Sequence, residues 1–106
     1  MSTKLLLACL AFSLPALAAD KKIERMFASK CGACHGKDGK AQTEKGKQME
    51  MRDIASADFQ KLTDDEMRKG INEGVKTPKG TMEGFKDDLK PADVDGLIAH
   101  MRGMKK

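Results

Sequence analysis

Apolar residues recur at helical spacing near the start of the chain. Ile23, Met26 and Phe27 fall at positions i, i+3 and i+4, which places them on one face of a helix. The segment from residue 20 to residue 30 is therefore predicted to be an amphipathic helix whose apolar face packs in a core. This helix runs directly into a short cysteine-containing motif at residues 31–35.

A second helix is predicted from its terminal signals. Thr63 followed by Glu66 three residues later is the signature of an N-cap with a capping box. Met67 and Ile71 then share one face, and Gly74 is a typical helix end. The sequence therefore predicts a helix between Thr63 and Gly74.

The last predicted helix opens at Pro91, because proline is favoured at the first helical position. Its apolar face consists of Val94, Leu97, Ile98 and Met101. We expect this helix to pack in the core.

The stretches between these helices are predicted to be less regular. Residues 40–48 are polar without an apolar period and indicate a surface loop, while residues 53–59 allow only a short helical turn. Residues 75–84 contain Pro78, Gly80 and Gly84, which predicts an extended loop. No strand pattern is visible, so the predicted fold class is all-α.

The chemistry of the chain is concentrated in Cys31-Gly32-Ala33-Cys34-His35. Two thiols separated by two residues, with a histidine directly after the second, form the c-type haem attachment pattern. Each thiol can add to one haem vinyl group, and the adjacent imidazole can then reach the iron. Cys31, Cys34 and His35 are therefore the predicted cofactor-binding residues, with His35 as a metal ligand.

Two other interpretations of a paired cysteine motif remain. A redox-active disulfide of the thioredoxin kind requires a surrounding βαβ pattern, and a zinc site requires a second pair of ligands. Neither is visible, because the only cysteines after residue 20 are Cys31 and Cys34 and the only other histidine is His100. The motif therefore favours covalently bound haem.

Residues 1–19 have the pattern of a cleaved secretory signal peptide. Lys4 provides a basic start, Leu5 to Leu14 an apolar run too short to span a bilayer, and the alanines that follow a cleavage zone. Cleavage is expected after Ala18 or Ala19, so the mature domain is residues 20–106. Cys9 raises the alternative of a lipid anchor, but only four residues separate it from Lys4.

The size and charge of the mature chain limit its function. From residue 20 onward it has 87 residues, with 19 Lys and Arg against 16 Asp and Glu. A chain this short and charged is poorly placed to bury enough apolar surface alone, and a haem would complete its core. The charge excess is mild, and no arginine-rich or aromatic-interleaved patch indicates nucleic-acid binding.

Three segments together resemble the class I cytochromes c, which are small single-haem electron carriers. They are Phe27 to Gly36 with the haem motif, Gly80 to Phe85 in the predicted loop, and Leu97 to Arg102 in the final helix. The resemblance implies a small cytochrome c fold, with three to four helices around one covalent haem. It also implies a periplasmic monomer that is not an enzyme and has no stable membrane insertion.

The resemblance further implies that Met82 is the second axial ligand of the iron, opposite His35. A thioether favours ferrous over ferric iron, so a His/Met pair raises the reduction potential. Met49 and Met51 are the serious rivals, since they lie in a region without predicted structure. Met26, Met67 and Met101 are interpreted as core packing residues, and Met104 lies beyond the last strong helical residues. By the resemblance, His100 occupies a packing site between the terminal helices.

Three departures from the family pattern stand out. Glu83 occupies the position where the family usually has a proline after the ligand methionine, and Ile23 replaces a family glycine in the first helix. The first change predicts a less rigid loop, and the second predicts a shifted crossing of the terminal helices. The third departure is that the family's proline loop, whose carbonyl commonly accepts a hydrogen bond from the ring N–H of the proximal histidine, is not recognisable after Gly46.

The expected function is one-electron transfer between a reductase and an oxidase, by cycling of the iron between Fe(III) and Fe(II). By the resemblance, lysines near the exposed haem edge would attract acidic partner surfaces, and the candidates are Lys30, Lys37, Lys79 and Lys86. Two alternatives stay open. They are a haem-based small-molecule sensor or weak peroxidase, and a cytochrome subunit of a larger redox enzyme.

Overall fold

The structure, a computed structural model, describes residues 21–105. The predicted signal peptide, its cleavage site and Cys9 lie outside the described residues. Residues 21–30 are helical and are followed by these elements: α2 (Gly32–His35), α3 (Glu44–Gln48), α4 (Ala57–Gln60), α5 (Asp64–Glu73), β1 (Val75–Thr77), β2 (Gly80–Met82) and α6 (Pro91–Arg102). Helices predominate within residues 21–105, as the sequence predicted. No helix of residues 21–105 has the length and apolar character needed to cross a membrane.

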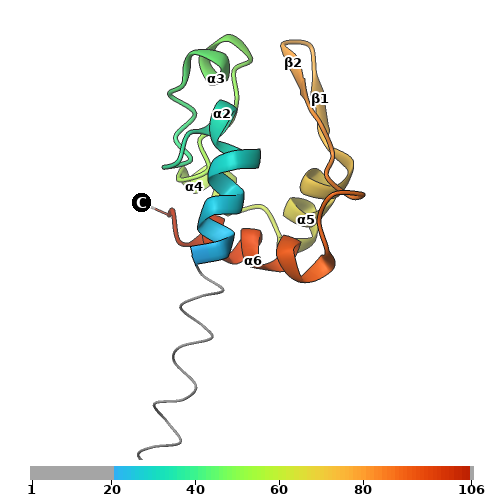
Figure 1. The fold of residues 1–106 in the computed structure, drawn as a ribbon. Helices are drawn as coiled ribbons and strands as arrows, with labels where there is room; N and C mark the ends of the chain where they lie inside the picture. Colours follow the sequence, from blue (N-terminus) through green and yellow to red (C-terminus); the bar gives the residue numbers. More distant parts are fainter. Residues whose placement is uncertain (1–20, 106) are drawn as a thin grey trace, which may run out of the picture.

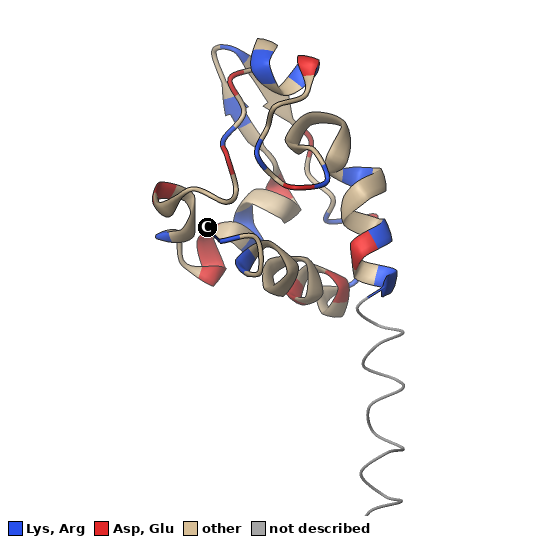
Figure 2. Ribbon diagram, turned by 90° about the vertical axis from the view of Figure 1, so that its left-hand side faces the viewer, with Lys and Arg blue, Asp and Glu red and all other residues tan. Residues whose placement is uncertain are grey.

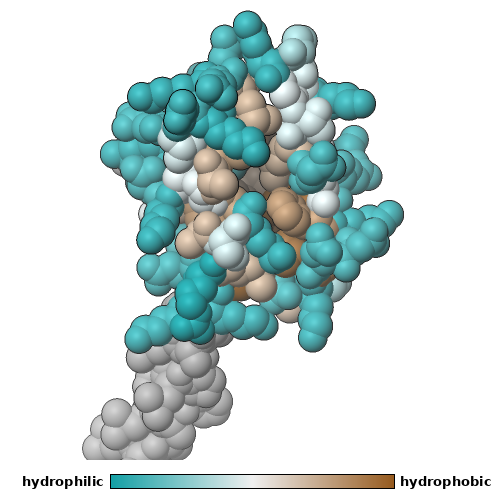
Figure 3. All heavy atoms as spheres, turned by 45° about the horizontal axis from the view of Figure 1, so that its top comes forward, coloured by the Kyte–Doolittle hydropathy of each residue, from teal (hydrophilic) through white to brown (hydrophobic). Residues whose placement is uncertain are grey.

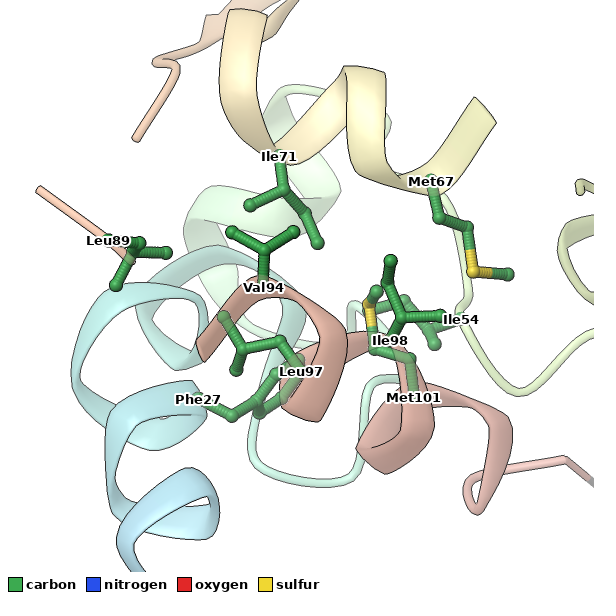
Figure 4. Packing of buried hydrophobic residues seen from close by; sticks show 9 residues of the cluster. All are labelled: Phe27, Ile54, Met67, Ile71, Leu89, Val94, Leu97, Ile98 and Met101. Carbon is green, nitrogen blue, oxygen red and sulfur yellow. The ribbon is translucent and has the colours of Figure 1, made fainter. Parts of the chain in front are cut away.

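The core lies where α5, α6 and the helix of residues 21–30 face one another (Figures 1 and 4). The four predicted apolar residues of α6 are all buried, and Met67 and Ile71 of α5 are buried opposite them. The cluster is completed by Phe27, Ile54 and Leu89. The helical spacing in the sequence therefore identified these core faces correctly.

Helix α5 begins and ends where the sequence predicted. The Thr63 hydroxyl accepts a hydrogen bond from the Glu66 amide at 3.1 Å, and the Glu66 carboxylate accepts one from the Thr63 amide at 3.0 Å. Gly74 ends the helix with a positive φ of 83°. A capping box of this kind satisfies two amides that the first helical turn leaves unpaired.

The two terminal helices meet at complementary small and large residues. A Cβ placed on Gly96 of α6 would lie 2.7 Å from Cδ1 of Ile23, so this glycine makes room for the isoleucine. One turn further along, the rings of Phe27 and His100 pack with centroids 5.1 Å apart. The glycine that the family places on the first helix thus has a counterpart on α6, and His100 serves as a packing residue.

The interpretation of residues 75–84 as an irregular loop is wrong. They form an antiparallel hairpin in which Val75 pairs with Met82 and Thr77 pairs with Gly80. The turn at Pro78 and Lys79 is closed by the Thr77 hydroxyl, which donates to the Gly80 carbonyl at 3.1 Å. Three residue pairs are too few to leave an alternating pattern in the sequence, which is why the hairpin was missed.

The interpretation of residues 40–48 as a loop throughout is also wrong, because α3 lies within them. Thr43 caps this helix, and its hydroxyl accepts from the Gly46 amide at 2.9 Å. The same hydroxyl donates to the carbonyl oxygen of Cys34 at 2.6 Å. Helix α3 has no apolar stripe because it packs through its backbone against α2.

Candidate functional site

A cavity of about 620 Å³ is lined by residues of the haem motif, of the segment 49–54 that follows α3, of α5 and α6, and of the hairpin. In Figure 1 the haem motif and α3 lie on one side of the molecule and the hairpin lies on the other. Figure 3 shows the mouth of the cavity as a hollow of apolar atoms ringed by hydrophilic side chains. Cys31, His35 and Met82 all contribute to its lining. The volume lies within the range of about 300–1,000 Å³ that is usual for small-molecule and cofactor sites.

The haem motif continues the first helix into the cavity wall. The Cys31 amide donates to the Phe27 carbonyl at 2.8 Å, and the His35 amide donates to the Cys31 carbonyl at 3.0 Å. Helical geometry places residues i and i+4 on one face, so Cys31 and His35 both reach the cavity. Cys34 lies on the same turn, is half-buried and does not contribute to the lining.

Cys31 and Cys34 are not joined to each other by a disulfide bond. Burial raises the pKa of the Cys31 thiol to about 11, although the neighbouring Lys30 ammonium acts in the opposite direction. Redox-active Cys-x-x-Cys motifs have the reverse property, a lowered thiol pKa. The environment of Cys31 therefore disfavours a thioredoxin-like role. Among residues 21–105, no three His, Cys, Asp or Glu side chains are grouped to hold a metal ion, as a zinc site of that kind would require.

His35 is 8% exposed and is held by a backbone carbonyl. Its Nδ1 lies 3.3 Å from the carbonyl oxygen of Arg52. Because a carbonyl only accepts, this hydrogen bond places the proton on Nδ1 and leaves the lone pair of Nε2 for a metal. Burial lowers the pKa of the imidazole, and the Arg52 hydrogen bond opposes that shift.

The carbonyl partner of His35 is thus a functional feature that the sequence did not reveal. A proline loop was the expected signal, and Arg52 lies in a segment without one. The Arg52 side chain itself turns to Phe59, with its guanidinium carbon 5.5 Å from the ring centroid. Only the main chain of Arg52 holds the imidazole, so no side-chain pattern could have identified it.

Close packing of α3 on α2 fixes the His35 side of the cavity. Gly46 is buried, and a Cβ at this position would collide with the carbonyl oxygen of Cys34 and would lie 2.9 Å from that of Ala41. The Ala41 amide also donates to the His35 carbonyl at 2.8 Å. Glycine is therefore required at residue 46 because two backbones meet there.

Met82 reaches the cavity from β2 of the hairpin. The base of the hairpin is a close crossing of two glycines, since a Cβ on Gly74 would collide with the carbonyl oxygen of Met82 and would lie 2.8 Å from the Gly84 amide. The Phe85 amide donates to the Ile71 carbonyl at 2.8 Å, which fastens this base to α5. Met82 is therefore carried by an arm whose base is fastened to α5.

Met49 and Met51 also line the cavity, as the sequence analysis allowed. Both are half-buried and follow α3 directly. The Met51 amide donates to the Gly46 carbonyl at 2.9 Å. The structure thus brings one histidine, one of the two cysteines and five methionines to a single cavity, the other two methionines being Met67 and Met101 of the helical core.

Comparisons with known proteins agree with this architecture. The family described as cytochrome c oxidase, cbb3-type, subunit III matches residues 18–101. The solved structure of the c-type cytochrome KustC0563 is 36% identical, with a TM-score of 0.68 over 78% of this chain and 96% of that chain. A single-substitution mutant of that cytochrome is 38% identical, with a TM-score of 0.65 over 76% and 95%. A search of curated proteins found no match.

The chain belongs to this cytochrome c family, and its small helical fold is a cytochrome c fold. Membership of the c-type cytochromes implies haem c and indicates electron transfer rather than catalysis. The donors found here fit that cofactor. An apolar cavity holds a histidine whose Nε2 is left free by its tautomer, together with a motif thiol and thioethers.

Proposed function

We propose that this protein is a single-haem electron carrier, with haem c attached through Cys31 and Cys34 and with His35 and Met82 as axial ligands. The observation that carries the proposal is the cavity, which has an anchored histidine on one side and a methionine-bearing hairpin on the other. When bound, haem supplies an iron that cycles between Fe(III) and Fe(II). The protein chain supplies the ligands, the covalent anchors and an apolar enclosure.

The position of His35 supports its role as the proximal ligand. Its helix carries both attachment cysteines, and the Arg52 carbonyl holds the ring in the tautomer that presents Nε2. A hydrogen bond from Nδ1 also raises the basicity of the coordinating nitrogen. The chain therefore orients this ligand through its own main chain.

The arrangement of the methionines favours Met82 over its rivals. Met49 and Met51 follow α3, which packs against α2, and the next residue, Arg52, is bonded to His35. The main chain of these two methionines therefore belongs to the segment on the His35 side, although the Met49 side chain reaches Gly80 of the hairpin. Met82 comes from the hairpin across the cavity, the direction from which a ligand opposite His35 must approach (Figure 1).

Ligation of the iron by two side chains determines the chemistry. If His35 and Met82 both held the iron, the protein would leave no coordination site open to oxygen or peroxide. The thioether stabilises ferrous iron relative to ferric iron and raises the reduction potential. We therefore assign a carrier function and no enzymatic activity.

The docking surface is proposed at Lys30 and Lys86, with Lys37 and Lys79 as further candidates. The Lys30 ammonium lies 5.8 Å from the centroid of the Phe85 ring. Lys86 follows Phe85 in the chain, so these two basic residues belong to neighbouring parts of the fold. Basic and acidic positions are otherwise interspersed over the ribbon (Figure 2). Reduction by an acidic partner should slow as ionic strength rises, and a flat response would remove this assignment.

The remaining assignments follow from the sequence. We propose export by the signal peptide of residues 1–19, a periplasmic location, and a monomeric domain of residues 20–106 without membrane insertion. A reductase and an oxidase are the expected partners. Nucleic acid is not expected to bind.

Two observations favour second candidates. The family description names an oxidase subunit, so association with a larger redox enzyme is the first alternative, and co-purification with a partner would establish it. Glu83 follows Met82 where a proline would stiffen the chain, so a displaceable sixth ligand, as in a sensor or weak peroxidase, is the second. Rapid carbon monoxide binding to the reduced protein at neutral pH would favour that second alternative.

The test of the ligand assignment is absorption spectroscopy of the wild-type protein and Met82→Ala in both oxidation states. We expect the weak far-red band of methionine on ferric iron in the wild type and its loss in Met82→Ala. Met51→Ala, which removes another cavity thioether, should keep the band. Retention of the band in Met82→Ala would contradict the assignment and move it to Met49 or Met51.

A further inference from the structure

The side chain of Met49 lies directly against the hairpin at Gly80. A Cβ placed on Gly80 would lie 2.5 Å from Cε of Met49, 3.0 Å from its Cγ and 3.4 Å from its Cβ. The absence of a side chain at Gly80 therefore makes the space that Met49 occupies. This contact joins the end of α3 to the outer part of the hairpin, near its turn.

The contact lies on the face of β2 that carries Met82. Side chains of residues i and i+2 in a strand point to the same side. The side on which a Cβ of Gly80 would meet Met49 is therefore also the side from which Met82 projects. All three residues line the cavity. Met49 therefore supports the inner face of the hairpin beside the proposed ligand.

A second contact between the same two segments is weaker. The Lys79 ammonium lies 3.9 Å from a carboxylate oxygen of Glu50, and these side chains are 60% and 69% exposed. An exposed ion pair at this distance contributes little to stability. Of these two contacts, the apolar one between Met49 and Gly80 is therefore the one expected to hold the segments together.

Residues 49–52 connect this contact to the histidine. Glu50 has a positive φ of 51°, the Met51 amide bonds to the Gly46 carbonyl, and the Arg52 carbonyl accepts from His35. One end of the segment thus touches the hairpin, and the other end holds the proximal imidazole. The hairpin's other anchor is its base, where Phe85 bonds to Ile71.

We propose that Met49 is a positioning residue that holds the hairpin, and with it Met82, against the cavity. The proposal rests on Met82 being the axial ligand. It also accounts for Glu83, because support from Met49 at the outer part of the hairpin replaces the stiffening that a proline after the ligand methionine would give. Met49 acts through packing and does not bind the iron.

The test uses the holoprotein of Met49→Ala and Met49→Leu, with Met104→Ala as a matched control. Met104 is also a half-buried methionine packed on a glycine, Gly39, but it lies outside the cavity lining. Met49→Ala should weaken the far-red band and speed carbon monoxide binding to the reduced protein about tenfold, the effect of roughly 1.4 kcal/mol. Met49→Leu and Met104→Ala should behave like the wild type.

A second pair of variants tests the contact itself. Gly80→Ala should also speed carbon monoxide binding, because its new methyl group collides with Met49. In the double variant Met49→Ala/Gly80→Ala that collision is absent, so its effect should be smaller than the two single effects combined. Strict additivity would contradict the proposed contact.

The outcomes separate this inference from the ligand assignment. If Met49→Ala matches the wild type while Met82→Ala loses the far-red band, Met82 is the ligand and the positioning role is overturned. If Met49→Leu loses the band and Met82→Ala keeps it, Met49 is itself the ligand and both proposals fail. Partial loss in Met49→Ala with rescue in Met49→Leu supports both.

Discussion

The two sides of the cavity are built in different ways. On the His35 side, residues 31–48 interlock through backbone contacts, including those of Gly46 with the Cys34 carbonyl and of Ala41 with the His35 carbonyl. On the hairpin side, residues 75–84 form three residue pairs anchored at one end. Val75 of the hairpin is 46% exposed, whereas His35 is 8% exposed.

This difference indicates that the two proposed ligands are held with different rigidity. The histidine is fixed by the hydrogen bonds of its helix and by the Arg52 carbonyl that sets its tautomer. The methionine sits on an arm whose position depends on its base and on the side chain of Met49. Changes on the His35 side should therefore affect haem retention and stability, and changes on the hairpin side should affect ligand exchange.

The largest effect is expected from removing the attachment chemistry. Cys31→Ala/Cys34→Ala should abolish covalent haem, because no thiol remains to form a thioether. Without a bound cofactor to complete its core, the small domain should also accumulate poorly. Haem staining after denaturing electrophoresis measures the first effect. Haem that stays with this denatured double variant would contradict the proposed attachment.

A large loss of stability is expected from Gly46→Ala. The added methyl group collides with backbone oxygens on the His35 side, so the free energy of unfolding should fall by about 2–3 kcal/mol. Gly103→Ala is the matched control, because this residue has a φ of −70° and the nearest contact of an added Cβ is 3.3 Å. Denaturant titration of both holoproteins should show a change within about 0.5 kcal/mol for the control. Equal losses would show that residue 46 is not specially constrained.

A smaller loss of stability with a larger effect on the iron is expected from Gly84→Ala. The methyl group would collide with the carbonyl oxygen of Asn72 and would lie 2.7 Å from the carbonyl carbon of Glu73, at the base of the hairpin. Because the hairpin is exposed, it can move as a unit, and the free energy of unfolding should fall by only about 1 kcal/mol. Carbon monoxide should bind the reduced variant faster than it binds Gly46→Ala. The reverse order would remove the contrast between the two sides.

The smallest effect is expected from Glu50→Gln. It removes the exposed ion pair with Lys79 and should change the free energy of unfolding by less than about 0.5 kcal/mol. The far-red band should not change. A band as weak as that expected for Met49→Ala would mean that charge, and not packing, holds the hairpin.

The sequence predicted the parts of the fold that depend on local signals. Residue types at fixed spacings predict the capping box of α5, the proline that opens α6 and the apolar faces of both helices. The haem motif is equally local, since its chemistry requires consecutive residues. In the structure Cys31, His35 and Met82 all line one cavity. Met82 was named only through the resemblance to class I cytochromes c, and its role as a ligand stays a proposal.

The features that the sequence did not predict depend on backbone contacts between distant segments. Helix α3 packs through Gly46, the partner of His35 is the main-chain carbonyl of Arg52, and the hairpin holds only three residue pairs. The importance of Met49 at Gly80 also appears only in three dimensions. A glycine in the sequence can indicate that space is needed at its position. Which residue fills that space is known only from the folded structure.

The account depends most directly on a cofactor bound to Cys31 and Cys34. Mass spectrometry of the purified exported protein under denaturing conditions measures this. The account predicts the mass of the processed polypeptide plus one haem, lost when both cysteines are replaced. A folded, colourless protein with the mass of the polypeptide alone would contradict it.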